Sequence, residues 1–438
     1  MHTENGTIGT DLKVAYTSAS VLKPYARNPR THSKKQIRQI ANSIKEFGFT
    51  NPILVDDEMG VIAGHGRLEA AKQLGVREVP TIRLNDMSDE QKRAYILADN
   101  KLAENAGWDR EILAIEFQHL TDAYIGFDIE VTGFEMAEID LVIREAEGGA
   151  SDDPADDVPS LDNDTPPVCA PGDLWLLGKH KLLCADATNR ESYENLMVGE
   201  RAQMVFSDPP YNVPIDRHVC GLGSIQHDEF AMASGEMSKA EFTAFLSTVL
   251  GHMAAFSADG AIHFICMDWR HMDDLIAAGR DVYSELKNLC VWAKTNGGMG
   301  SLYRSQHELV FVFKNGTVPH INNVELGRFG RYRTNLWSYA GTNTLKKDRL
   351  DELSMHPTVK PAALVEDAIL DCSKRNGLVL DAFSGSGTTI VAAEKAGRIA
   401  RALEIDPQYV DVAIKRWSAL TGEQAVHASS GFTFEELS

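Results

Sequence analysis

Several patterns that mark particular classes of protein are missing from this sequence. None of the six cysteines belongs to a Cys-x-x-Cys pair, and no histidines stand at zinc-finger spacing, which argues against a disulfide framework and a structural metal site. No apolar run is long enough to span a bilayer, and the polar start MHTENGTIGTDLK lacks the basic and apolar regions of a signal peptide. We therefore expect reduced, mostly buried cysteines in a cytoplasmic protein without membrane contact.

The sequence also lacks an internal repeat of solenoid length, so its 438 residues predict two domains with connecting material. The formal net charge of -20 would by itself argue against a nucleic-acid partner. The acids, however, are concentrated between Glu145 and Asp164, with prolines and glycines among them. Such a stretch cannot bury a core, and we expect residues 145–167 to be a solvated acidic linker between the two domains.

The N-terminal part shows helical and strand patterns in alternation. Apolar residues stand at helical spacing in KKQIRQIANSIKEFGF, and GHGRLEAAKQLG predicts a turn that enters a helix ending at Gly75. Ser88 is the expected N-cap of a further helix. Gly64, Gly66 and Arg67 stand at a helix start, where free backbone N–H groups and a guanidinium would bind an anion.

The C-terminal part carries a different pattern. GDLWLLGKHKLLCAD predicts a β-hairpin, and after it apolar strand segments alternate with helical segments, from AQMVFS to IARALEID. This alternation is typical of an α/β fold, in which helices cover both faces of a parallel sheet. Ligand sites in such sheets form at the carboxyl ends of the strands.

One predicted strand ends in residues that suit a nucleoside-containing cofactor. The strand LVL runs into Asp381, and the glycines of FSGSGTT open the next helix, where a ligand can approach the backbone closely. About twenty residues later, ARALEID ends another strand at Glu404, which suits the hydroxyl groups of a ribose. No Gly-Lys-Ser/Thr follows the glycines, so a phosphate loop for ATP fits less well.

A second strand, MVFS, ends in Asp208-Pro209-Pro210-Tyr211. An exocyclic amine of a base is a poor nucleophile because its lone pair is delocalised into the ring, so an enzyme must hold both N–H bonds in a geometry that frees that pair. Asp208 can accept one of these bonds, and the carbonyl of Pro209, fixed by the two proline rings, can accept the other. Tyr211 offers a face on which an extruded base can stack. The structural alternative for these four residues alone is a rigid proline turn that Asp208 caps.

Three motifs together resemble the set found in S-adenosylmethionine-dependent DNA amino-methyltransferases of the beta class: DPPY at 208–211, HPTVKP at 356–361 and DAFSGSGTT at 381–389. The resemblance implies a Rossmann-like class I methyltransferase domain of permuted motif order over residues 168–425, with S-adenosyl-L-methionine as cofactor and double-stranded DNA as substrate. Ala382 stands where the family usually has proline. By this resemblance the cofactor-binding residues are Asp186, Lys360, Pro361, Asp381, Phe383, Ser384, Gly385, Gly387, Thr388 and Glu404.

The resemblance leaves the methylated amine open between two choices. An aspartate at position 208 is typical of enzymes that methylate adenine N6, whereas serine is commoner among those that methylate cytosine N4. We therefore expect a site-specific adenine-N6 DNA methyltransferase, and keep cytosine N4 as the alternative. RNA or a protein amide as the substrate is a further alternative.

Residues 12–100 resemble the ParB-like N-terminal domain, a smaller α+β domain, through NPR at 28–30 and AGHGRLEAA at 63–71. The resemblance implies a site for the phosphates of DNA or of a nucleotide, and fewer arginines than the family consensus argue against nucleotide hydrolysis. The residues of this anion site are Asn28, Arg30, Gly64, Gly66 and Arg67. We expect a DNA-engaging or regulatory accessory domain, with a flexible N-terminus at 1–11, a helical extension at 101–144 and a tail at 426–438.

A basic and aromatic segment between the catalytic and cofactor motifs, GRFGRYRTNLWSYAGTNTLKKDRL, suits phosphate contact and base stacking. An ordinary basic loop is the alternative. The candidates for DNA binding are Arg328, Arg331, Arg333, Lys346 and Lys347. The recognised DNA sequence, and whether the chain is a monomer or a homodimer, stay open.

A rival hypothesis treats the chain as a DNA-binding or nucleotide-switch protein, in which the ParB-like domain is the working part and the methyltransferase fold is inactive. The DPPY motif and the glycine loop are both intact, which favours the enzyme. Two-part chains of this kind resemble proteins of phages, mobile elements and restriction-modification systems.

Overall fold

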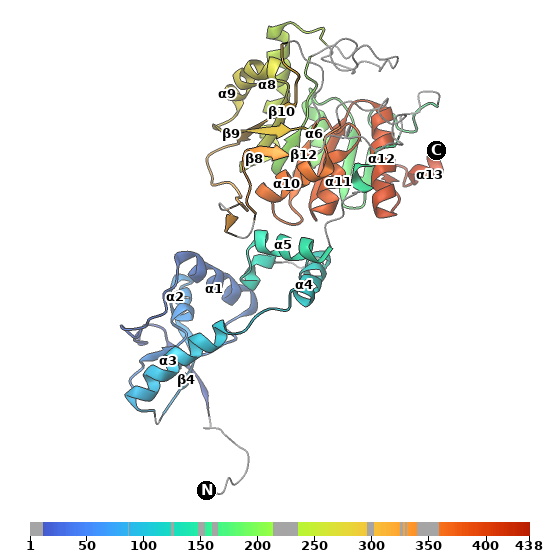
Figure 1. Ribbon diagram of the computed structural model, residues 1–438. Coiled ribbons are helices and arrows are strands. Elements are labelled where there is room, and N and C mark those ends of the chain that lie inside the picture. Colours follow the sequence, from blue (N-terminus) through green and yellow to red (C-terminus); the bar gives the residue numbers. More distant parts are fainter. Residues whose placement is uncertain are drawn as a thin grey trace. The chain divides into compact units, whose positions relative to one another are not determined.

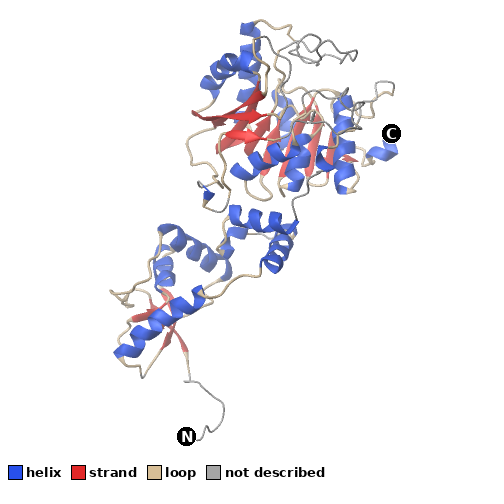
Figure 2. Cartoon of the chain, in the orientation of Figure 1, coloured by secondary structure: helices blue, strands red, loops and turns tan. Residues whose placement is uncertain are grey.

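The computed structural model divides into two compact units, Met1–Glu147 and Gly148–Ser438 (Figures 1 and 2). The division falls inside the stretch predicted to be an acidic linker. The residues that the structure describes are 12–85, 87–123, 127–147, 154–159, 165–212, 235–295, 302–324, 327–328, 331–339 and 359–438.

The N-terminal unit contains a four-stranded mixed sheet in the order β1-β4-β2-β3. Strand β4 (Glu78–Arg83) pairs antiparallel with β1 (Val14–Ser18) and parallel with β2 (Ile53–Val55), which pairs antiparallel with β3 (Val61–Ala63). Ile53, Leu68 and Val79 form part of its apolar core.

The helices of this unit begin and end close to the predicted positions. Helix α1 (Lys34–Phe47) starts after Ser33, α2 (His65–Gln73) is followed by Gly75 at a left-handed φ of 69°, and α3 (Asp89–Glu104) starts at Ser88. Ser88 and Gln91 bond each other's backbone N–H groups in a capping box, as the sequence indicates.

A second apolar cluster in this unit is purely helical. It joins α4 (Arg110–Asp122), the 3-10 turn η1 (Ile129–Thr132) and α5 (Met136–Glu147) around Phe117, Ile139 and neighbouring side chains. The predicted helical extension therefore has an apolar core distinct from that of the sheet.

The C-terminal unit is built on a ten-stranded sheet in the order β11-β9-β10-β8-β7-β12-β13-β6-β5-β14. The five central strands, β8 to β6 in that order, are parallel, whereas β10 is antiparallel to both of its neighbours and β5 is antiparallel to β6. The prediction of a parallel sheet holds for the centre alone; the edges are mixed. The strands are β5 (Leu174–Leu177), β6 (His180–Cys184), β7 (Ala202–Ser207), β8 (Ser257–Met267), β9 (Glu285–Ala293), β10 (His307–Lys314), β11 (Leu336–Ser338), β12 (Leu378–Asp381), β13 (Ile399–Glu404) and β14 (Val426–His427).

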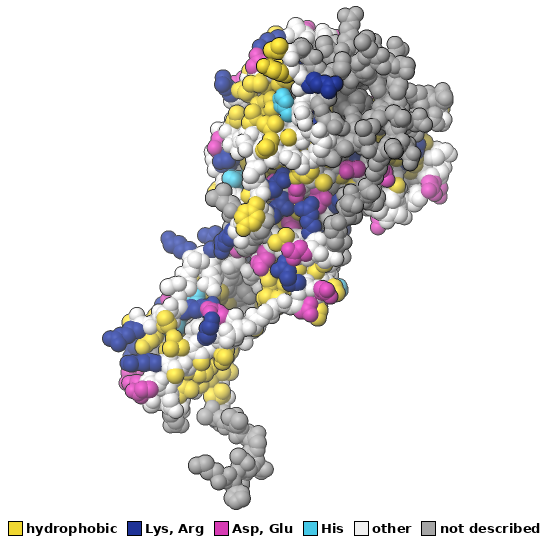
Figure 3. All heavy atoms as spheres, in the orientation of Figure 1, with side chains coloured by type: hydrophobic (Ala, Val, Ile, Leu, Met, Phe, Trp, Pro, Cys, Tyr) yellow, Lys and Arg dark blue, Asp and Glu magenta, His cyan; other side chains and the backbone are white. Residues whose placement is uncertain are grey.

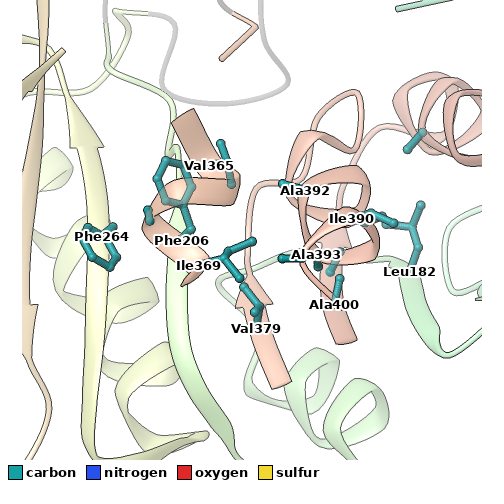
Figure 4. Packing of buried hydrophobic residues seen from close by; sticks show 14 of the residues in the cluster. Leu182, Phe206, Phe264, Val365, Ile369, Val379, Ile390, Ala392, Ala393 and Ala400 are labelled. Carbon is teal, nitrogen blue, oxygen red and sulfur yellow. The ribbon is translucent and has the colours of Figure 1, made fainter. Parts of the chain in front are cut away.

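Helices cover both faces of this sheet. The helices α6 (Arg190–Met197), α8 (Lys239–Ala255) and α9 (Met272–Val282) pack on one face, and α10 (Ala362–Cys372), α11 (Thr388–Lys395) and α12 (Pro407–Thr421) pack on the other. Alternate residues of a strand serve opposite faces: Met204 and Phe206 of β7 join the cluster under α10, and Val205 joins the cluster under α8. Figure 4 shows Phe206 next to Val365 and Ile369 of α10.

Two predictions about the ends of this unit are wrong. The stretch 145–167 is not wholly solvated, because Pro154–Asp156 forms the 3-10 turn η2 and Ala155 is buried against Ala362 and Val391. The predicted tail is part of the domain, because β14 pairs with β5 and Phe434 of α13 (Phe434–Leu437) packs on Trp175. Composition did not indicate these contacts, because few apolar side chains make them: Ala155 in the first segment and Phe434 in the second.

Two smaller expectations can be compared with the structure. The five described cysteines are free thiols, as predicted, and four of them are buried. Within the described ranges, no helix is long and apolar enough to cross a membrane.

Candidate active site

The two predicted strand-end motifs meet at one edge of the sheet. Strand β7 leads into Asp208, its parallel neighbour β12 ends at Asp381, and the carboxyl ends of parallel strands lie at the same edge. The Ser207 hydroxyl donates a hydrogen bond to Asp381 Oδ1 at 2.9 Å, which joins the two motifs directly.

Asp208 lies at one end of a chain of alternating charges. Its Oδ2 is 2.5 Å from Lys360 Nζ, which is 2.9 Å from Glu308 Oε2, and Glu308 in turn binds the ammonium of Lys294. The Tyr211 hydroxyl donates to the other carboxylate oxygen of Asp208 at 2.5 Å. Both oxygens of Asp208 are therefore held, one by a cation and one by a phenol.

Burial makes this network electrostatically strong. The side chain of Lys360 is 4% exposed and that of Glu308 is 15% exposed. Burial disfavours the charge of Lys360, but the carboxylates of Asp208 and Glu308 outweigh it and raise the pKa of Lys360 above its usual value. Burial likewise opposes ionisation of Glu308, yet Lys360 and Lys294 lower its pKa. The network thus pairs two carboxylates with two ammonium groups.

The structure gives Lys360 a different neighbour from the predicted one. Its ammonium lies on the catalytic motif and 5.6 Å from the centre of the Tyr211 ring, so it covers one face of the ring predicted to stack on a base. The phenol of Tyr211 has a pKa raised by burial and by Asp208, and so stays a hydrogen-bond donor. The contacts of Lys360 and Pro361 with the cofactor stay predictions.

Sequence reasoning missed Glu308 and Lys294. The signal for Glu308 was present, because HELVFVFK places an acid at the second residue of an otherwise apolar strand. An acid there needs a partner, which turns out to be a pair of lysines.

The glycine loop is held on Glu404, whose two carboxylate oxygens accept backbone N–H groups. Gly385 N donates to Oε2 at 2.7 Å and Asp406 N donates to Oε1 at 3.0 Å. Burial nevertheless raises the pKa of Glu404 to about 7. Gly387, at a φ of 81°, can only be glycine, because a Cβ there would lie 2.8 Å from the Cβ of Ala413.

Asp381 supports the loop from beneath, and its oxygens are taken up by protein donors. Oδ1 accepts from Ser207 and from the Phe383 N–H at 3.0 Å, and Oδ2 accepts from the Thr389 hydroxyl at 2.6 Å. Burial raises the pKa of Asp381 to about 6. Asp381 thus joins β7, the loop and α11, and its contact with the cofactor stays a prediction.

Thr388 and Ser386 are likewise occupied, by a buried guanidinium that sequence reasoning did not single out. Arg416 donates to the Ser386 carbonyl at 3.1 Å, to the Thr388 hydroxyl at 2.9 Å and to the carbonyl of Ala155 at 2.7 Å. Asp156 Oδ1 accepts the N–H of Ala362 at 2.7 Å, at the start of α10. The turn η2 thus links the glycine loop to the helix that follows Lys360 and Pro361.

Other residues of the predicted cofactor set lie at the same edge of the sheet, and some of them offer hydrogen-bonding groups or space to a ligand. The Ser384 hydroxyl is buried without a hydrogen-bond partner among the described residues, and the space in front of the Gly385 Cα is open. Asp186 follows β6, with Oδ1 bonded to the N–H of Thr188 at 2.7 Å. Phe383 packs near Phe245. An unsatisfied hydroxyl, an open glycine and acids at strand ends fit a nucleoside-containing ligand.

The predicted DNA-binding arginines are not available as predicted. Arg331 and Arg333 have side chains 8% and 17% exposed, and both bind Asp367 and Asp371 of α10. This ion-pair cluster replaces phosphate as their partner, so a basic and aromatic composition indicated the wrong role. Arg328 is exposed, and Lys346 and Lys347 lie outside the described residues.

Basic side chains on the face seen in Figure 3 lie in several small groups over both units, with acidic side chains among them. One exposed pair stands in the turn before β10, where Tyr303 is 83% exposed beside Arg304.

In the N-terminal unit, part of the predicted anion site is assembled at the start of α2. Gly64 has a left-handed φ of 100°, and the Arg67 guanidinium lies within 2.9 Å of where its Cβ would be. Arg67 Nε has no partner within the described residues, and burial lowers the pKa of Arg67. Gly66 lies close to Ile40 and His32.

The other members of this predicted site are engaged within the unit. Arg30 forms a salt bridge with Glu104, and Asn28 Oδ1 accepts the N–H of Arg30 at 3.1 Å. The imidazole of His65 accepts the N–H of Tyr25 at 3.1 Å, and burial lowers its pKa. These contacts hold the loop 25–30 near the start of α2.

Comparison with known families divides the chain into three parts. Residues 202–415 match the DNA methylase family, residues 5–101 match the ParB N-terminal domain, and residues 111–171 match the ParB-methyltransferase HTH domain. The C-terminal unit is therefore homologous to DNA methylases, and it is joined to an N-terminal ParB-like domain. The helical extension of α4 and α5 falls in the HTH match, which helical periodicity alone did not indicate.

Each of these relatives matches only one part of the chain, either the ParB-like part or the methyltransferase part. The ParB-like nuclease domain-containing protein YnaK of Escherichia coli K12 is 50% identical over 82 residues, which are 19% of this chain and 94% of that protein. The type II methyltransferase M.HinfI of Haemophilus influenzae is 25% identical over 237 residues, which are 50% of this chain and 63% of that protein. The crystal structure of the M1.HpyAVI-SAM complex is 20% identical, with a TM-score of 0.40, and the match covers 54% of this chain and 97% of that one.

Proposed function

We propose that this chain transfers a methyl group from S-adenosyl-L-methionine to the N6 amine of adenine in double-stranded DNA, at a base turned out of the duplex. The observation that carries the proposal is the arrangement of Asp208, a hydrogen-bond acceptor at the end of β7, beside the glycine loop of β12. The match of residues 202–415 to the DNA methylase family supports methyl transfer as the reaction.

The residues at the strand ends suit the cofactor. Glu404 suits ribose hydroxyls, Ser384 and the backbone at Gly385 offer hydrogen bonds to the remainder, and Asp186 suits the adenine of the cofactor. When bound, S-adenosyl-L-methionine supplies a methyl group already activated by its sulfonium charge.

The protein's own residues prepare the amine. Each carboxylate oxygen of Asp208 has a second lone pair, so it can accept an amine N–H while it keeps Lys360 or Tyr211. The Pro209 carbonyl, held by the ring that follows it, accepts the second N–H and fixes the orientation of the amine. The acid at position 208 supports adenine N6 over cytosine N4.

Incubation with S-adenosyl-L-methionine carrying a labelled methyl group and with unmethylated genomic DNA, followed by nucleoside analysis, tests this proposal. We expect label in N6-methyladenine. Label in N4-methylcytosine would show a DNA methyltransferase that acts on cytosine N4 instead of adenine N6. Label in neither nucleoside would refute both activities.

We propose a supporting role in DNA engagement for the N-terminal unit. The match of residues 111–171 to an HTH domain and the basic anion site at Gly64 and Arg67 support this role. The rival hypothesis, a nucleotide switch on an inactive methyltransferase fold, is less favoured because the charge network at Asp208 is complete.

A further inference from the structure

Glu308 and Lys294 belong to neither predicted motif, yet they complete the charge network at Asp208. We propose that both are positioning residues for the methyl transfer: Glu308 holds the ammonium of Lys360 against Asp208 and takes up part of its charge, and Lys294 fixes Glu308. This inference rests on the proposed function, because it concerns how Asp208 receives the amine.

The sheet places these groups across three strands. Glu308 is paired with Trp292 in the β9–β10 register, and Lys294 follows the end of β9, with its ammonium 4.7 Å from the centre of the Trp292 ring. Strand β10 neighbours β8, which neighbours β7, and Lys360 bridges from the start of α10 to both carboxylates. A lysine that served only to neutralise Asp208 would not need a second buried acid.

The balance of charge decides how well Asp208 accepts an N–H. With Glu308 present, Lys360 divides its attraction between two carboxylates, and Asp208 keeps electron density for the amine. Without Glu308, the whole charge of Lys360 acts on Asp208, which becomes a weaker acceptor for the amine. Without Lys294, Glu308 loses its other cation and draws Lys360 more strongly, away from Asp208. The two removals therefore change the contact between Lys360 and Asp208 in opposite directions.

The other titratable groups that face Asp208 are Tyr211, Cys266 and Asp381. Burial raises the pKa of the Tyr211 phenol and of the Cys266 thiol, so both stay neutral near pH 7. Asp381, with a pKa raised to about 6, is clamped by the same donors whichever residue is changed. The opposite changes at the contact between Lys360 and Asp208 are thus particular to Glu308 and Lys294.

The experiment uses the full chain with Glu308→Gln, Glu308→Asp and Lys294→Met, and measures the single-turnover rate at which label passes from S-adenosyl-L-methionine to unmethylated plasmid DNA. Glu285→Gln is the control, since Glu285 forms an ion pair with Lys287 on β9 away from the site. Equilibrium dialysis of the labelled cofactor and thermal unfolding show which variants are folded.

We expect the transfer rate to fall at least about tenfold in Glu308→Gln and about threefold in Lys294→Met, with cofactor affinity within about twofold of the original in both. Glu308→Asp restores part of the rate because it keeps the charge, although its shorter reach leaves the rate reduced. Glu285→Gln does not change the rate.

An unchanged transfer rate in both Glu308→Gln and Lys294→Met, or a fall in cofactor affinity as large as the fall in rate, would overturn the positioning role. If Glu308→Gln does not fold, the rates and cofactor affinities of Lys294→Met and Glu308→Asp decide the matter. An original protein that transfers no label to DNA refutes the proposed function instead, so the two failures are distinct.

Discussion

The ammonium of Lys360 lies 2.5 Å from the carboxylate of Asp208, a residue 152 positions away in the sequence. This pair gives the carboxylate of Asp208 a cationic partner in a place that is only partly exposed. An ionised carboxylate only accepts hydrogen bonds, which is what an amine with two N–H groups requires. The salt bridge between Lys360 and Asp208 therefore supports the role proposed for Asp208 as the acceptor of an amine N–H.

The first prediction concerns Asp208 itself. Asp208→Ala removes the acceptor of one amine N–H, and we expect the rate of methyl transfer to fall by at least about a thousandfold. Lys360 keeps Glu308 as its partner, and the residues at the cofactor loop are untouched, so cofactor affinity stays within about threefold. Label transfer and equilibrium dialysis measure the two quantities. Loss of cofactor binding in a folded variant would contradict the role given to Asp208.

A second prediction follows from Glu404, whose pKa is raised to about 7 in the folded protein. Ribose hydroxyls donate to the ionised form, so cofactor affinity should rise as the pH passes upward through about 7, with uptake of the cofactor releasing a proton. Glu404→Gln should bind more weakly at high pH and lose this dependence.

The same carboxyl also affects stability. Because its folded pKa lies above the unfolded value, the folded state binds the extra proton, and stability falls as the pH rises between the two pKa values. Thermal unfolding of the original protein and of Glu404→Gln across this window checks the sign. Equal pH dependence in both proteins would assign the effect to Asp381, whose pKa is raised to about 6.

The third prediction concerns the turn η2, which links the glycine loop to α10. Asp156→Ala removes the acceptor of the Ala362 N–H, and we expect cofactor affinity to fall about three- to tenfold. Arg416→Met removes hydrogen bonds from a buried cation to three groups and should lower the free energy of unfolding by at least about 2 kcal/mol. Glu435→Ala, at an exposed acid of α13, is the control. Unchanged cofactor affinity in Asp156→Ala would make η2 a plain packing element.

These examples show where sequence reasoning works and where it fails. Asp208 and Gly385 were predictable because each motif is contiguous and follows an apolar strand whose carboxyl end defines the site. The contact of Arg416 with Ala155 spans 261 residues and that of Lys360 with Asp208 spans 152, and no local pattern encodes either pairing. The prediction that Arg331 and Arg333 bind DNA was wrong for a related reason. Their acidic partners on α10 lie at least 34 residues further along the chain.

A fourth prediction separates Arg331 from the surface arginines. Removing one partner of its buried cluster with Asp367 and Asp371, as in Arg331→Met, should destabilise the fold by about 3–5 kcal/mol. The dependence of DNA affinity on salt should stay the same in the folded fraction. Arg304→Ala, at the exposed turn beside Tyr303, should instead leave stability unchanged and reduce the slope of log affinity against log salt by about 0.9. Reversed results would restore the original prediction for Arg331.

The last prediction compares two truncated chains. A chain that begins at residue 148 keeps η2 and every residue of the charge network, so it should bind the cofactor and methylate DNA, with weaker DNA affinity because the ParB part and residues 111–147 of the HTH match are gone. A chain that begins at residue 165 also lacks Ala155 and Asp156, which removes the Ala155 carbonyl from Arg416 and the Asp156 carboxylate from the N-terminus of α10. We expect this second chain to lose cofactor affinity and thermal stability relative to the first. Cofactor binding by dialysis and DNA binding by fluorescence anisotropy measure the two effects separately. Equal cofactor affinity in both chains would show that η2 adds nothing to the site, and a folded but inactive first chain would make the N-terminal unit part of the catalytic machinery.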